Sequence, residues 1–295
     1  MEFLVSPPPH ASHPSFPVVG LGASAGGLAA LQQFFAAMPL NSQMAFVVIL
    51  HLSPDYESHA AAILQRATAI AVQQVTEPVR VAPNTIYIIP PDRHLRMQDG
   101  MLVLTEAERP YGSRVAIDFF FRTLAESYTT YAACIVLSGA GADGSVGITR
   151  VKETGGVTFA QDPQEAAYDA MPRNAIATGM IDFVLPVAAM PTRLLTLWRN
   201  AAQIALPEGG NTPIIDQRMA AQEALRDVLA NVRARTGYDF SYYKRPTLLR
   251  RIERRMQVTA TADLLAYRDY LQNHPAEASQ LLQDLLISVT NFFSR

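Results

Sequence analysis

The sequence predicts an α/β protein: a doubly wound, mainly parallel β-sheet with one β-hairpin, followed by a small all-helical domain. From Val18 to about Ala205, short runs of β-branched residues alternate with stretches rich in Ala, Leu and Gln at helical spacing, as in β-α-β units. Proline and glycine then interrupt every period between Leu206 and Pro213. Beyond this break no strand pattern recurs, and apolar residues return at intervals of three and four, which indicates helices.

The apolar runs place the strands near residues 18–22, 45–50, 71–75, 85–89, 101–104, 132–138, 156–160 and 181–185. The helical spacing places helices near residues 27–37, 58–67, 115–127, 145–154, 166–178 and 188–203, and then at 214–235, 245–258, 261–273 and 275–289. Strands 85–89 and 101–104 have no helical pattern between them, and Gln98-Asp99-Gly100 is a turn sequence. These two strands are therefore expected to form an antiparallel hairpin.

The chain of 295 residues is long enough for two domains. We expect a flexible tail at 1–16, an α/β domain at 17–205, a linker at 206–213 and a helical domain at 214–295. The formal net charge of −2 argues against a broad nucleic-acid footprint, although residues 211–295 carry 12 basic and 9 acidic side chains. Cys134 is the single cysteine and lies in an apolar run, so it is expected to be a buried thiol. The sequence lacks a signal peptide and a membrane-length apolar run, so a soluble, cytoplasmic protein is expected.

The segment PVVGLGASAGG, residues 17–27, places Ser24 in a G-x-S-x-G pattern directly after a predicted strand. In this pattern a sharp turn exposes the serine hydroxyl beside the amino end of a helix, which suits a nucleophile. The same residues also fit the dinucleotide pattern G-x-G-x-x-G/A. A dinucleotide fold requires an acidic residue at the end of the second strand, but that strand ends in His51, which favours the nucleophile.

Three polar residues follow predicted strands: Ser24, His51 and Asp143. Since ligands bind at the carboxyl ends of parallel strands, these residues are expected to converge. Taken alone, a serine after glycine is more often a turn or helix-cap residue, and an aspartate before glycine is more often a turn former. Together they predict a Ser-His-Asp triad, with the backbone N–H groups of Ala25 and Ala140 stabilising the oxyanion. No cofactor is expected, and the lack of a cysteine cluster or paired histidines argues against a metal site.

Four segments carry a family resemblance: GLGASAGG, VVILHLSPD, PPDRH and LSGAGADGSVG. From about Val18 to Trp198 the chain resembles the catalytic domain of the chemotaxis protein-glutamate methylesterase, CheB. The resemblance implies hydrolysis of glutamyl methyl esters on chemoreceptors, with Ser24, His51 and Asp143 as the triad, and deamidation of receptor glutamines as a second activity. Ala25 and Ala140 stand where the family usually has threonine and methionine. The receiver domain that gates the family's enzyme is not expected in the 17 residues before the first strand.

From about Leu225 to Phe293, the segments YYKRPTLLRRIERRM and LLQDLLISVTNFF resemble the N-terminal helical domain of the receptor methyltransferase CheR. The chain is therefore identified as similar to a CheB-CheR hybrid, with no methyl transfer expected from these residues. Arg250, Arg251, Arg254 and Arg255 are spaced to form one basic face, which predicts contact with an acidic receptor helix bundle or a simple solvated surface.

Two other functions remain open at this point. The chain could be a catalytically silent receptor-binding fragment, or a dinucleotide-binding α/β protein. The short linker also motivates the hypothesis that the helical domain shields the mouth of the active site.

Overall fold

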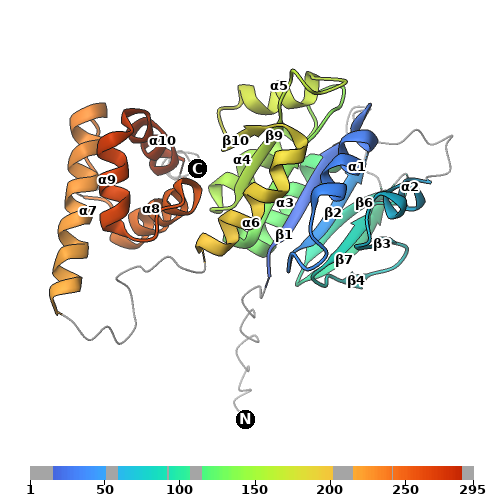
Figure 1. Ribbon diagram of the computed structural model, residues 1–295, viewed down its shortest axis with the longest axis horizontal. Helices are drawn as coiled ribbons and strands as arrows, with labels where there is room; N and C mark the ends of the chain where they lie inside the picture. The colour runs from blue at the N-terminus through green and yellow to red at the C-terminus, as the bar shows by residue number, and fades with distance from the viewer. Residues whose placement is uncertain are drawn as a thin grey trace, which may run out of the picture.

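A computed structural model describes residues 16–50, 59–91, 93–106, 115–201, 215–240 and 242–287. Seven parallel strands form the main sheet in the order β10-β9-β8-β1-β2-β5-β3 (Figure 1). Along the chain these strands are β1 (Val18–Ala23), β2 (Ala45–Leu50), β3 (Ala71–Gln74), β5 (Thr85–Ile88), β8 (Ala132–Val136), β9 (Val157–Gln161) and β10 (Phe183–Leu185). The central strands are buried along their whole length, which is expected for a parallel sheet with helices on both faces.

Helices cover both faces of this sheet (Figure 1). One face packs against α1 (Gly27–Ala37), α2 (Ala60–Ala67) and α6 (Met190–Ala201), with Phe34, Phe35 and Phe46 at the centre of that core. The other face packs against α3 (Ala116–Tyr128), α4 (Ser145–Glu153) and α5 (Ala170–Ala177). Two short 3-10 helices, Thr129–Tyr131 and Val187–Ala189, lead into β8 and α6. The predicted doubly wound fold is confirmed.

An antiparallel hairpin that contains β7 (Met101–Glu106) is present, but the predicted partner strand is wrong. Strand β5 does not pair with β7 but enters the main sheet between β2 and β3. The antiparallel partner of β7 is β6 (Arg93–Gln98), and β4 (Val79–Arg80) joins β7 at its other edge. Three of the four residues of β5 are buried, as in a central parallel strand. In β6, buried Leu95 and Met97 are separated by exposed Arg96, and the charged residues made this segment hard to recognise as a strand.

The helical region contains α7 (Ile215–Thr236), α8 (Arg245–Thr259), α9 (Leu264–Asn273) and α10 (Pro275–Leu286). Their apolar faces form a core of their own, in which Ile252, Tyr267 and Leu281 are inaccessible to solvent. A Pro follows the first residue of α8 and another begins α10, and the Asp263 side chain accepts a 2.8 Å hydrogen bond from Ala266 N at the start of α9. The predicted four-helix region is therefore present.

A buried ion cluster joins the helical region to the α/β region. Arg254 of α8 pairs with both Asp182 and Asp284, and Lys152 Nζ lies 3.3 Å from Asp182 Oδ1 and 3.5 Å from Asp284 Oδ1. Burial alone would raise the pKa of Asp182, but the charges of Arg254 and Lys152 hold it well below its usual value. Two cations thus offset two carboxylates across the contact.

Backbone carbonyl groups complete this contact. Arg251 donates to the carbonyl oxygens of Lys152 (3.1 Å) and Glu153 (2.8 Å) in the last turn of α4, where a cation also complements the helix dipole. Arg254 Nε donates to Gly156 O at 3.1 Å, and Arg193 Nη2 donates to Val258 O at 2.7 Å. These bonds lie at the amino ends of β9 and β10, so α8 is held against the amino edge of the sheet.

Candidate active site

Ser24 follows β1 directly, at the carboxyl edge of the sheet. Its backbone N–H donates to Ser138 O at 3.0 Å, and its own carbonyl accepts from Gly27 N at 2.9 Å at the start of α1. Gly26 has φ of +71°, a left-handed conformation that glycine adopts without strain. The turn therefore fixes a half-buried serine between a strand end and a helix amino end, as the G-x-S-x-G pattern predicts.

The glycines of β1 are required by packing. A Cβ atom added to Gly22 would lie 2.4 Å from Ile117 Cγ2, and one added to Gly20 would lie 3.0 Å from Phe121 Cε1. Both glycines thus allow α3 to approach the central strand closely. This close packing accounts for the glycine spacing that also fits a dinucleotide pattern.

The loop after β8 closes over the serine turn. The Ser138 hydroxyl donates to Ala25 O at 2.9 Å and accepts from Tyr168 N at 3.0 Å, so it links three loops. A Cβ atom on Gly139 would lie 2.9 Å from Ser24 Cβ and 2.1 Å from Met171 Sδ. Only glycine fits at this position, and the backbone of Gly139 consequently lies next to the Ser24 side chain.

Asp143 lies in the same loop and accepts two backbone hydrogen bonds from the first turn of α3. Ile117 N donates to Oδ2 at 3.0 Å and Asp118 N donates to Oδ1 at 2.9 Å. Asp118 returns this interaction, since its Oδ1 accepts from Gly147 N at 2.7 Å in the first turn of α4. The two aspartates exchange caps between neighbouring helices, which fixes the orientation of the Asp143 carboxylate.

Burial raises the pKa of Asp118 to about 6, and the nearby charge of Asp143 adds to this effect. The N–H groups of Gly147, Val146 and Gly144 act in the opposite direction, because they stabilise the carboxylate. Sequence reasoning did not single out Asp118. An aspartate in the first turn of a helix is usual on the surface, and only its burial marks this one as different.

The oxyanion hole was predicted to consist of two backbone N–H groups, that of Ala25 directly after Ser24 and that of Ala140 in the loop after β8. No hydrogen bond between described residues uses the N–H of Ala25 or of Ala140. Gly141 has φ of +89°, and Asn174 Nδ2 donates to Gly141 O at 2.7 Å, so a side chain of α5 supports this loop. Asn174 is a further residue that the sequence analysis missed.

His51 lies outside the described residues, so the structure does not test it. Strand β2 ends at Leu50, which pairs with Ala23, the residue before Ser24. The chain leaves β1 between β2 on one side and β8 on the other; β5 and β3 lie beyond β2, and β9 and β10 lie beyond β8. Such a topological switch point is where open α/β sheets bind ligands, and Ser24 and the Ser138–Asp143 loop meet there.

Comparison with known proteins decides the family. Residues 19–194 match the model of the family described as CheB methylesterase, and residues 223–286 match that of the CheR methyltransferase all-alpha domain. The chain belongs to the CheB methylesterase family. The crystal structure of the Thermotoga maritima CheB methylesterase catalytic domain matches with a TM-score of 0.59 at 30% identity, covering 62% of this chain and 100% of that one.

Two relatives of this CheB-family chain are named as methylesterases, and a third is uncharacterized. A putative protein-glutamate methylesterase/protein-glutamine glutaminase of Leptospira interrogans is 28% identical over 63% of this chain and 97% of its own length. The Thermotoga maritima protein-glutamate methylesterase/protein-glutamine glutaminase is 30% identical over 61% of this chain and 54% of its own length. A 104.1 kDa uncharacterized protein of Rhodobacter capsulatus is 33% identical over 79% of this chain, which spans 26% of that relative.

The predicted basic face of the CheR-type region is wrong for three of its four arginines. Arg251, Arg254 and Arg255 are 2%, 2% and 4% exposed. The first two bind the CheB-type region, and Arg255 forms a two-bond ion pair with Glu277 inside the helical region. Arg250 alone is exposed. Helical spacing correctly placed these residues together, but it did not reveal that carboxylates and carbonyl groups cover them.

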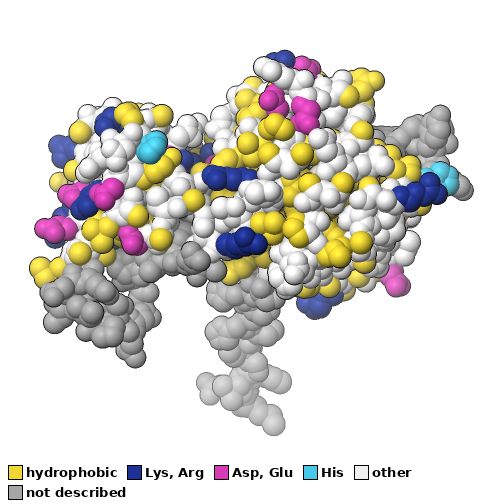
Figure 2. Space-filling model, viewed as in Figure 1, with side chains coloured by type: hydrophobic (Ala, Val, Ile, Leu, Met, Phe, Trp, Pro, Cys, Tyr) yellow, Lys and Arg dark blue, Asp and Glu magenta, His cyan; other side chains and the backbone are white. Residues whose placement is uncertain are grey.

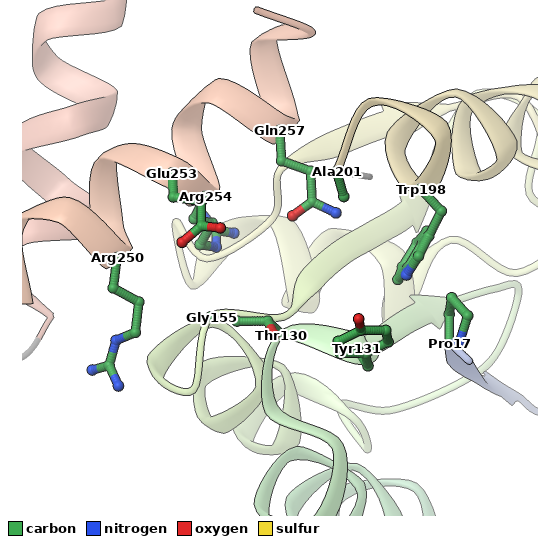
Figure 3. Close-up of a pocket in the computed structure, with 10 residues that line it drawn as sticks. All are labelled: Pro17, Thr130, Tyr131, Gly155, Trp198, Ala201, Arg250, Glu253, Arg254 and Gln257. Atoms are coloured by element: carbon green, nitrogen blue, oxygen red, sulfur yellow. The ribbon is translucent and has the colours of Figure 1, made fainter. Parts of the chain in front are cut away.

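The hydrogen bonds and ion pairs between described residues of the two regions do not support the shielding hypothesis. They lie at the amino edge of the sheet, whereas Ser24 and Asp143 lie at its carboxyl edge. A pocket of about 340 Å³ opens at the amino edge, between Arg250, Glu253 and Gln257 of α8 on one side and Tyr131 and Trp198 on the other (Figure 3). This pocket is separate from the serine turn.

Three further features concern the described residues. Cys134 is buried in β8, and burial raises the pKa of its thiol well above the usual value. Within the described residues, no three His, Cys, Asp or Glu side chains are arranged to hold a metal ion, and none of the described helices is long and apolar enough to cross a membrane. On the face shown in Figure 2, Lys and Arg side chains are scattered in small groups over both regions.

Proposed function

We propose that this chain is a protein-glutamate methylesterase that hydrolyses glutamyl methyl esters by a Ser-His-Asp mechanism. The observation that carries the proposal is the joining of two loops at the topological switch point of a CheB-type fold. One loop presents Ser24, and the other brings Gly139 against it and holds Asp143 three residues after Ala140. The names of the relatives from Leptospira and Thermotoga agree with this chemistry.

In the proposed reaction, Ser24 Oγ attacks the ester carbonyl carbon while His51 takes the hydroxyl proton. His51 then gives this proton to the methoxy oxygen as the bond from the carbonyl carbon to that oxygen breaks. Methanol departs, and the glutamyl group remains bound to Ser24 Oγ as an ester. Water, deprotonated by His51, then attacks the acyl carbon. The bond from that carbon to Ser24 Oγ breaks, His51 returns the proton to Oγ, and free glutamate is released. Asp143 orients the imidazole, and the two N–H groups on its carboxylate leave lone pairs for that task.

The N–H groups of Ala25 and Ala140 are proposed to stabilise the oxyanion. They act through the backbone, so the alanines at these positions preserve the function. Loss of one such donor typically costs about 3 to 4 kcal/mol of transition-state stabilisation. Gly27 N donates to Ser24 O at 2.9 Å, and Met171 N donates to Gly139 O at 3.0 Å. These two carbonyl groups share a peptide with the N–H groups of Ala25 and Ala140, so the bonds support the orientation of both donors.

The substrate is proposed to be the helical cytoplasmic region of a chemoreceptor, which places the activity in the cytoplasm. We also propose that residues 17–205 and 214–295 are separate folding units joined by residues 206–213. Arg251, Arg254 and Arg255 are engaged within the chain, so any contribution of α8 to receptor contact falls to Arg250.

A product assay tests this proposal. The full chain is incubated with a methyl-esterified receptor fragment and with the same fragment carrying glutamine at the modified positions. Methanol release from the first supports the methylesterase, and ammonia release from the second would add deamidation. Binding of the fragment without either product would instead favour a catalytically silent receptor-binding protein.

A further inference from the structure

Tyr168 is an exposed aromatic residue beside the serine turn. It lies between β9 and α5 and is 54% exposed, although large apolar side chains are usually buried. A single exposed tyrosine is ordinary on a protein surface, so its exposure alone carries no function. The position of Tyr168 beside the serine turn is the observation that suggests a function.

The Tyr168 ring packs against the turn that presents Ser24. A Cβ atom on Gly26 would lie 3.1 Å from Tyr168 Cδ2 and 2.9 Å from Ala167 Cβ. Gly26 is two residues after Ser24, and its lack of a side chain lets the ring approach. One edge of the ring thus rests on the turn, while more than half of the side chain faces solvent.

The backbone of Tyr168 is held independently of its ring. The Tyr168 N–H donates to Ser138 Oγ at 3.0 Å, and the Tyr168 carbonyl accepts from Gly139 N at 2.9 Å. Met171 N donates to Gly139 O at 3.0 Å just beyond. The backbone of Tyr168 thus belongs to the hydrogen-bond network that fixes the loop beside Ser24. Because the ring makes none of these bonds, removing the ring leaves the network intact.

The described residues next to the ring carry no net charge. The exposed residues Ala140, Gly141 and Ala142 have no ionisable side chains, and the neighbouring Asp169 and Arg173 pair with each other at 2.6 Å. No hydrogen bond between described residues uses the Tyr168 hydroxyl. An aromatic ring in such surroundings is suited to contact with apolar side chains.

We infer that Tyr168 is a specificity-determining residue that contacts apolar side chains flanking the esterified glutamate of a protein substrate. This inference rests on the proposed methylesterase function and adds a contact outside the reacting group. Since the ring lies against Gly26, two residues beyond Ser24, a small ester reaches Ser24 without needing it. A protein substrate, by contrast, extends beyond the reacting ester and covers the Tyr168 ring.

The test compares Tyr168→Ala with the unchanged full chain on two substrates, a methyl-esterified receptor fragment and p-nitrophenyl acetate. Burial of part of an aromatic ring corresponds to a change in kcat/KM of about 5- to 30-fold. We expect this loss on the receptor fragment, mainly through KM, and a change of less than about twofold on the small ester. Tyr168→Phe should retain activity on both substrates, because it keeps the ring.

Tyr131→Ala is the matched control, since Tyr131 is 39% exposed but lies at the amino edge of the sheet. An equal loss on both substrates for Tyr168→Ala would assign the ring a structural role and overturn the inference. An unchanged kcat/KM on the receptor fragment would overturn it as well. If the unchanged chain hydrolyses neither ester, the proposed function itself fails, and this inference fails with it.

Discussion

Asp143 and Asp118 show how single residues fix the geometry of the candidate site. Each carboxylate caps the helix that begins beside the other residue, so two like charges are held near one another by backbone N–H groups. The sequence predicted Asp143 from its place after a strand. It did not predict Asp118, because the turn that brings Gly147 to its carboxylate is a tertiary contact.

The raised pKa of Asp118 predicts a specific dependence of stability on pH. The folded protein retains the Asp118 proton up to about pH 6, whereas a carboxyl group with the ordinary value of 3.8 releases it earlier. The unfolded chain therefore binds fewer protons between these values, and stability contributed by this group falls as pH rises from about 4 to 6. Asp118→Asn should remove this fall while keeping an acceptor for Gly147 N.

We expect Asp118→Asn to increase the free energy of unfolding by on the order of 1 kcal/mol at pH 7 to 8, relative to its effect below pH 4. The gain is smaller than the whole pKa shift would give, because a charge at the amino end of α4 is also favourable. Urea unfolding across pH 4 to 8 measures it, with the exposed turn residue changed in Asp99→Asn as control. A pH-independent effect of Asp118→Asn would contradict this account.

At the scale of elements, α5 supports the loop that carries the proposed oxyanion donor. Met171 N and Asn174 Nδ2 donate to Gly139 O and Gly141 O, and Met171 Sδ packs where a side chain on Gly139 would lie. The predicted helix at 166–178 overlapped α5 but began four residues early. The difference matters, because residues 167–169 form the loop that contacts the serine turn.

Asn174→Ala should lower kcat of ester hydrolysis by about 3- to 10-fold, since the loop beside Ser24 loses a fixed contact but keeps its N–H donor. Stability should change by less than about 1 kcal/mol, because the side chain is exposed. Steady-state kinetics measures the effect. Asn273→Ala is a matched control, since Asn273 also donates its amide to a backbone carbonyl, that of Asp269 in α9. Equal kcat values for the two variants would argue against the support of this loop by α5.

Strand pairing was less predictable than strand position. The runs at 85–89 and 101–104 are real strands, yet their proximity in sequence suggested the wrong partner. Pairing depends on which face of each strand is buried, and β5 shows burial on both faces only in the folded sheet. The pairing of β1 with β2 and β8, in contrast, agrees with the expectation that the carboxyl ends of the strands before Ser24 and Asp143 lie close together.

At the scale of the whole molecule, the ion cluster at Arg254 fixes the helical region to the amino edge of the sheet, away from Ser24. Helical periodicity predicted that the arginines share a face, but the partners Asp182 and Lys152 are about 70 to 100 positions away in sequence. Such a long-range contact is not encoded in local spacing. This explains why the prediction of an exposed basic face failed.

Arg254→Met should reduce the free energy of unfolding by about 3 to 5 kcal/mol, because Asp182 then keeps Lys152 alone as an ion-pair partner among the described residues, and Asp284 keeps Lys152 and the more distant Arg255 at 4.0 Å. Arg250→Met, on the exposed side of the same helix, should change it by less than about 0.5 kcal/mol. Chemical unfolding measures both variants. Similar losses in the two would contradict the role of the ion cluster in joining the regions.

The central claim is that Ser24 is the nucleophile of a glutamyl methylesterase, and its most direct test is the rate of methanol release by Ser24→Ala. The matched control is Ser279→Ala, an exposed serine on α10. The account predicts that Ser24→Ala loses at least about 10³-fold in kcat on a methyl-esterified receptor fragment, while Ser279→Ala retains the full rate. Methanol release by a folded Ser24→Ala variant at the rate of the unchanged chain would contradict the claim.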